Sequence, residues 1–78
     1  MPKIEILLKA KYKKIRYEYA FTVGADSLPI SWQASNILDV PNNGTYWVWI
    51  RNKLTLAVTK NVAIVNCVDG ENVCTVVV

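Results

Sequence analysis

The chain has 78 residues, of which 53% are hydrophobic and 19% are charged, so it is long enough for one domain and too apolar for intrinsic disorder. It contains no histidine, the commonest general base and metal ligand, and its three glycines form no phosphate-binding loop. Its formal net charge is only +3, and no apolar run approaches the roughly 18 residues that cross a membrane. These features speak against an enzyme, a metal or cofactor site and a membrane span, and we expect a single domain over residues 1–78.

The first third of the chain predicts two strands joined by a basic reversal. Residues 4–8 and 15–23 alternate apolar and polar side chains, as a strand with one buried face does, and KYKK at 11–14 predicts the reversal. Around it lies a basic patch made of Lys9, Lys11, Lys13, Lys14 and Arg16. Charged side chains at strand edges commonly prevent edge-to-edge pairing, which is the simplest interpretation of this patch. With neighbouring tyrosines the patch also suits single-stranded nucleic acid, which we rank below a protein partner because the net charge is modest.

The middle of the chain predicts short strands separated by turns. GADSLP at 24–29 interrupts the alternation, and ISW at 30–32 predicts a short strand whose Trp32 we expect in the core. ILDV at 37–40 predicts another strand. PNNG at 41–44 is the strongest turn signal of the chain, because Pro fixes one φ angle while Asn and Gly tolerate positive φ.

GTYWVWIRN at 44–52 predicts a strand with two unlike faces. Tyr46, Val48 and Ile50 share one face and form an ordinary core set. The opposite face, which should be the solvated one, carries Thr45, Trp47, Trp49 and Arg51. Tryptophan and arginine are enriched at binding hot spots, and an exposed apolar patch usually marks a contact. These four residues are therefore the predicted interaction surface.

The paired tryptophans also allow a structural role or a sugar-binding role. In the structural role, the N-terminal segment or a loop covers this face from within the chain, and the indoles stabilise the fold. In the sugar-binding role, the alternate indoles form a flat platform for a sugar ring, with polar contacts from Gln33, Asn52 or Arg51. The sugar-binding role would make the protein a carbohydrate-binding module.

The last third of the chain predicts three strands and a pair of cysteines. The strands are LTLAVT at 54–59, VAIVNCV at 62–68 and VCTVVV at 73–78. DGEN at 69–72 predicts a hairpin between the last two, in which Cys67 faces Cys74. A small adjustment would bring that pair to disulfide geometry. Two free thiols acting as small hydrophobes fit the sequence equally well, and two cysteines alone cannot hold a structural zinc ion.

About seven or eight short strands with regular turn signals indicate an antiparallel sandwich or a small barrel. Tyr17–Tyr19, SWQASNILDV and NNGTYWVWIRN follow one another in an order that resembles bacterial immunoglobulin-like modules, especially the repeats of large cell-surface and gliding adhesins. The likeness covers residues 17–52. The positions that match the family's GTYTVTVRD-like strand are Gly44, Thr45, Tyr46, Val48, Arg51 and Asn52. The chain departs from the family at Trp47 and Trp49, which replace small polar residues.

This resemblance implies one immunoglobulin-like antiparallel β-sandwich of about seven strands, in which Tyr46 buries its ring and bonds its hydroxyl to the backbone at a corner. It also implies a non-catalytic structural or adhesion module of a phage virion or a bacterial surface protein, with a protein partner or a second copy of itself. The N-terminus lacks the order of regions that marks a signal peptide. We therefore expect either a virion component or a module of a longer surface protein.

Overall fold

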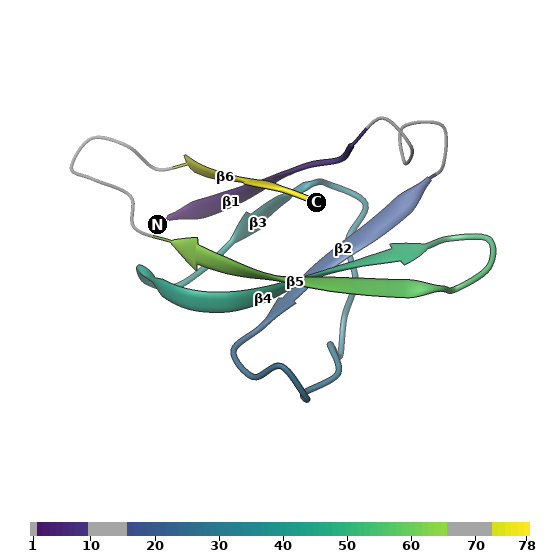
Figure 1. Cartoon of the computed structure of the whole chain (residues 1–78), viewed down its shortest axis with the longest axis horizontal. Coiled ribbons are helices and arrows are strands. Elements are labelled where there is room, and N and C mark those ends of the chain that lie inside the picture. Colours follow the sequence, from purple (N-terminus) through teal and green to yellow (C-terminus); the bar gives the residue numbers. More distant parts are fainter. Residues whose placement is uncertain (1, 10–15, 66–72) are drawn as a thin grey trace.

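The computed structural model describes residues 2–9, 16–65 and 73–78, and within these ranges it holds six strands and no helix (Figure 1). The strands are β1 (Lys3–Leu7), β2 (Tyr17–Thr22), β3 (Ile37–Asp39), β4 (Gly44–Asn52), β5 (Val58–Val65) and β6 (Val73–Val77). The prediction of an all-β chain is confirmed. The described part of the chain has six strands rather than about seven, for two reasons. Residues 30–32 form no strand, and the strands predicted at 54–59 and 62–68 are replaced by the single strand β5, which begins at Val58.

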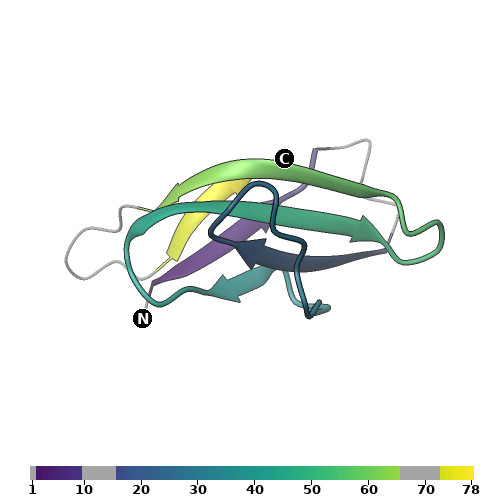
Figure 2. The same ribbon diagram turned by 90° about the horizontal axis from the view of Figure 1, so that it is seen from below.

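The six strands form two sheets of three, ordered β3-β1-β6 and β2-β4-β5. The second sheet is wholly antiparallel, whereas the first pairs β1 antiparallel to β3 and parallel to β6. Among the described strands, only β4 and β5 are consecutive neighbours in one sheet, and each other connection passes from one sheet to the other (Figure 2). The two sheets therefore form two layers, and the chain crosses repeatedly from one layer to the other.

The pairing of the last two predicted strands is not found between β5 and β6. β5 pairs with β4 in one sheet, while β6 pairs with β1 in the other. Cys74 on β6 is partly buried and is disulfide-bonded in the structure. The other cysteine of the sequence, Cys67, lies outside the described residues, as does the DGEN segment at 69–72. The predicted register that sets Cys67 opposite Cys74 therefore lies outside the described residues.

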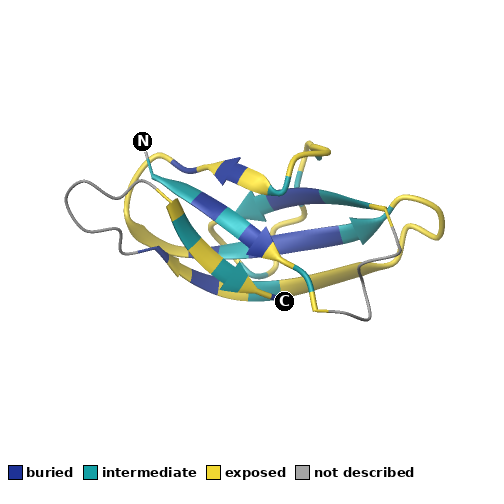
Figure 3. Cartoon of the chain, turned by 90° about the horizontal axis from the view of Figure 1, so that it is seen from above, coloured by how far each residue is buried: buried dark blue, intermediate teal, exposed yellow. Residues whose placement is uncertain are grey.

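The core lies between the two sheets, and alternate residues of each strand face it (Figure 3). One sheet contributes Ile4, Ile6, Leu38, Val40 and Val78, and the other contributes Tyr19, Tyr46, Val48, Ile50, Ala63 and Val65. The inward phase predicted for Tyr46, Val48 and Ile50 is confirmed. Val23, which the alternation of residues 15–23 placed inward, is 75% exposed because β2 ends at Thr22.

Tyr46 ties the start of β4 to the turn before it. Its ring is 5% exposed and meets the ring of Phe21 edge-on at 5.5 Å between centroids. Its hydroxyl donates a hydrogen bond of 2.8 Å to the carbonyl of Asn42. The predicted corner contact of Tyr46 is therefore present, and it holds the turn at 41–43 against the core.

We expect Tyr46→Phe to lower the free energy of unfolding by about 1 kcal/mol, because the variant keeps the buried ring but leaves the Asn42 carbonyl without this donor. Urea denaturation followed by fluorescence measures the change. An unchanged midpoint and slope would show that solvent satisfies that carbonyl equally well.

The hairpin between β4 and β5 contains one strained residue. Leu56 adopts a φ of 65°, the left-handed region that costs a branched side chain roughly 1 kcal/mol. The loop holds it there, because the Leu56 amide donates to the Asn52 carbonyl at 2.8 Å and the Asn52 side chain accepts from the amides of Leu54 and Thr55.

Leu56→Asn should therefore raise the free energy of unfolding by about 0.5–1 kcal/mol, since asparagine tolerates positive φ and the leucine is 61% exposed. Leu54→Asn is the matched control, because Leu54 lies in the same loop and is 91% exposed. Thermal unfolding of both variants tests this expectation, and equal shifts would contradict it.

Candidate interaction surface

The outward face of the β2-β4-β5 sheet carries the residues singled out by the sequence. The strand register arranges its side chains in four rows: Glu18–Arg51–Val58, Ala20–Trp49–Lys60, Thr22–Trp47–Val62 and Thr45–Ile64. Both tryptophans of β4 thus point away from the core between the sheets, as their phase predicts. Their surroundings nevertheless differ, because the segment that follows β2 covers only part of this face.

Residues 23–32 fold back over the row that contains Trp49 (Figure 2). The Lys60 ammonium donates a 2.6 Å hydrogen bond to the carbonyl of Ala25 and lies 5.2 Å from the centre of the Trp49 ring. The Trp49 indole N–H donates to the Thr22 hydroxyl at 2.8 Å, and that hydroxyl donates to the carbonyl of Gly24 at 2.8 Å. Trp49 is consequently only 5% exposed, so the structure places it under internal cover rather than on a free surface.

Arg51 is also engaged within the chain. Its guanidinium donates to one carboxylate oxygen of Glu18 at 2.9 and 3.2 Å, and its central carbon lies 4.3 Å from the centre of the Trp32 ring. Trp32 was expected in the core and instead packs on the outer face of the sheet, outside the core cluster. The strand predicted at 30–32 does not form, and Ile30 is fully exposed.

The remaining part of the face is open and apolar. We define the contact strip as Thr45, Trp47, Val62 and Ile64. Trp47 is partly exposed, with the Lys60 ammonium 5.4 Å from its ring centre, while Val62 is 49% and Ile64 is 73% exposed. Because Trp47 faces Val62 and Thr45 faces Ile64 across neighbouring strands, these four side chains form one surface.

Sequence reasoning found Thr45 and Trp47 but missed Val62 and Ile64. The segment 62–68 was paired with 73–78 in the predicted hairpin, so its outward side chains had no neighbours on β4. The tight turn after Asn52 was the signal that could have found them, because a β4–β5 hairpin sets Trp47 opposite Val62.

The polar groups suggested for a sugar platform have partners inside the chain. The Gln33 side-chain amide donates to the carbonyls of Ser35 at 2.9 Å and Ile37 at 2.7 Å. The Asn52 side chain accepts two loop amides, and Arg51 is held by Glu18. With Trp49 buried as well, the two indoles do not present a joint flat surface.

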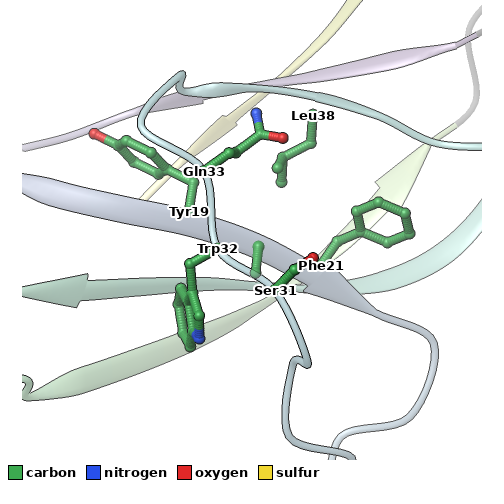
Figure 4. Close-up of a pocket in the computed structure, with 7 residues that line it drawn as sticks. Tyr19, Phe21, Ser31, Trp32, Gln33 and Leu38 are labelled. Atoms are coloured by element: carbon green, nitrogen blue, oxygen red, sulfur yellow. The ribbon is translucent and has the colours of Figure 1, made fainter.

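A small open cavity of about 110 Å³ lies where residues 31–33 cross the edge of β2 (Figure 4). Its lining includes Tyr19, Phe21, Ser31, Trp32, Gln33 and Leu38. Tyr19 and Gln33 close one end by exchanging two backbone hydrogen bonds of 2.8 and 2.9 Å. Burial, and to a lesser extent the neighbouring Tyr17, raises the pKa of the Tyr19 hydroxyl above its usual value. The lining offers no pair of acid and base groups.

Two residues of the predicted basic patch lie within the described ranges. Lys9 and Arg16 are exposed, whereas Lys11, Lys13 and Lys14 lie outside the described residues. Elsewhere in the described ranges, no group of three or more His, Cys, Asp or Glu side chains gathers as metal ligands would. No helix in the described residues is long and apolar enough to cross a membrane.

No protein-family model matches the chain, and no curated protein or solved structure matches it either.

The cover over Trp49 depends on Thr22, and Thr22→Val removes the acceptor of the indole N–H together with the donor to Gly24. We expect the free energy of unfolding to fall by about 1–2 kcal/mol, the typical loss when a largely buried donor goes unsatisfied. Thr45→Val makes the same chemical change on an exposed position of the same face and should alter stability by less than about 0.5 kcal/mol. Urea denaturation of both variants decides the matter, and equal effects would contradict the role of Thr22.

Proposed function

We propose that this chain is a non-catalytic structural or adhesion module that binds another protein through the contact strip. The observation that carries the proposal is the contiguous exposure of Trp47, Val62 and Ile64 on one sheet face. Apolar patches of this kind mark interaction sites on soluble proteins, and tryptophan is among the residues most enriched in binding hot spots.

The rigid support of the strip favours a preformed interface. Trp47 stands on the central strand of its sheet, between Thr22 on β2 and Val62 on β5. The neighbouring Trp49 is held under the segment 23–32, so the half of the sheet beside the strip is packed on both sides. A side chain held in this way loses little conformational freedom on binding, which leaves more of the contact energy for affinity.

The setting that we propose is a phage virion or a bacterial surface protein, with the chain as an immunoglobulin-like sandwich. The likeness of residues 17–52 to adhesin repeats and the corner contact of Tyr46 support this part of the proposal. The parallel pair of β1 and β6 and the six described strands are points on which the chain differs from the seven-stranded antiparallel arrangement that the resemblance implies.

A protein partner is favoured over a glycan by the composition of the strip. Its only polar member is Thr45, and the amide and guanidinium groups that would bind sugar hydroxyls already bond within the chain. Sugar recognition needs such groups beside the stacking ring, whereas a protein interface core is depleted of charge and rich in aromatic residues.

Trp47→Ser should remove the anchor of the strip without disturbing the core between the sheets. We expect it to reduce retention of the partner protein at least about tenfold when the immobilised chain is exposed to an extract of the source cells or virions. Ile30→Ser is the matched control, because Ile30 is fully exposed and lies off the strip.

Mass spectrometry of the retained proteins, including further copies of this chain, gives the readout. Circular dichroism and the unfolding midpoint confirm that each variant is folded. Identical sets of retained proteins on the wild type and on both variants would refute the contact strip. Selective binding of the wild type to a glycan array, with no protein retained, would favour the carbohydrate module instead.

A further inference from the structure

β5 presents an open sheet edge whose hydrogen-bonding groups can be assigned by residue. The amide of Asn52 donates to the carbonyl of Ala57 at 2.9 Å, which fixes the phase of the β4–β5 ladder. Because bonding alternates along an antiparallel pair, the odd-numbered residues of β5 bond to β4. The even-numbered residues Val58, Lys60, Val62 and Ile64 therefore direct their backbone N–H and C=O groups away from the sheet.

The other sheet edges are shorter or partly covered. Tyr19 on the edge of β2 exchanges both backbone bonds with Gln33. Within the described ranges, β3 has three residues and β6 has five, against eight for β5. No backbone bond from another described segment reaches the outer edge of β5.

No charge or proline blocks pairing at this edge. Natural edge strands are commonly guarded by lysines, prolines or bulges. The only charged residue in Val58–Val65 is Lys60, and its ammonium is drawn back over the sheet to the Ala25 carbonyl and the two indoles. The other outward side chains of the strand, Val58, Val62 and Ile64, are uncharged and 46%, 49% and 73% exposed.

We propose that β5 pairs antiparallel with β5 of a second copy of this chain, about a twofold axis that passes beside Asn61. An uncharged edge with free backbone groups complements another edge of the same kind, and it offers no charge by which an acidic or basic partner would be selected. The proposal rests on the proposed function in one respect, since it takes the surface at β5 to be a protein interface, and it names a second copy as the partner.

The register follows from the free groups and from Lys60. Centring on Asn61 sets Val58 opposite Ile64 of the second copy and Lys60 opposite Val62 of the second copy, so all four free-edge residues of each chain find partners. A shift that centres the pair on Lys60 would place two lysines directly opposite, which is unfavourable. A shift that centres it on Val62 would leave Val58 facing a residue beyond the end of β5.

The assembly would join two three-stranded sheets into one sheet of six strands. A twofold axis perpendicular to the sheet keeps both outward faces on the same side, so the two contact strips would lie on one continuous surface. Asn61, whose partly buried side chain lies on the inward face, would meet Asn61 of the second copy as a closely spaced, non-hydrogen-bonded pair.

Sedimentation velocity over a concentration series tests the pairing with two opposite charges at one position. Val62→Lys sets a lysine opposite Lys60 of the second copy and should raise the dimer dissociation constant at least about tenfold. Val62→Glu sets a carboxylate opposite the same lysine and should dimerise more tightly than Val62→Lys by a similar factor. Ile30→Lys, which adds the same charge at a fully exposed site off the edge, should match the wild type.

Asn61→Cys reports the register directly. Under mild oxidation it should give a dimer linked between the two introduced cysteines, identified by peptide mapping, because the twofold pair brings these positions together. Thr59→Cys should give no such link, since Thr59 would face Ala63 of the second copy.

Each outcome separates the edge pairing from the proposed function. A wild type that stays monomeric to the highest concentration would overturn the pairing, while retention of a different protein that depends on Trp47 would still support the contact strip. A dimer weakened equally by Val62→Lys, Val62→Glu and Trp47→Ser would show face-to-face contact of two strips and would also overturn the edge pairing. A dimer that ignores all three substitutions would place the interface elsewhere and overturn it as well.

Discussion

The organisation of this chain follows from a central strand that is apolar on both faces. β4 turns Tyr46, Val48 and Ile50 toward the core and Trp47 and Trp49 away from it. Two sheets of three strands can bury only one face each, so the second face of β4 needs cover from elsewhere. The single segment 23–32 supplies that cover and reaches only the Trp49 half. Among the described residues, the half that carries Trp47, Val62 and Ile64 therefore stays exposed.

Lys60 links this cover to the free edge. Its ammonium satisfies the Ala25 carbonyl and lies over both indoles, so a side chain that begins on the edge strand ends above the middle of the sheet. The same contact thus holds the segment 23–32 over Trp49 and keeps the only charge of β5 away from the strand edge, where it would otherwise discourage pairing. The stability of the face and the availability of the edge are coupled through this residue.

Local patterns predicted what depends on local geometry. The alternation within 44–52 was enough to assign the inward face of β4, whereas the corner contact of Tyr46 was expected from the family resemblance. The pairing of β6 with β1 was not accessible, because it joins residues about seventy positions apart and alternation does not encode a partner strand. Trp32 was misplaced for the same reason, since its position depends on Arg51 and on a loop crossing that no periodicity reveals. The open half of the strip needed the β4–β5 register before Val62 and Ile64 could be seen beside Trp47.

The parallel pairing of the first and last strands also determines how the domain carries mechanical load. Lys3 lies beside Val73 and Leu7 beside Val77, so the start of β1 and the end of β6 leave the pair in opposite directions (Figure 1). Tension applied at these two points slides the strands along each other and strains all their hydrogen bonds together. Peeling, in which the bonds break one at a time, would need strands that leave from the same end. The topology therefore makes the chain resist tension applied between its first and last described strands, because that tension loads the β1–β6 pair in shear.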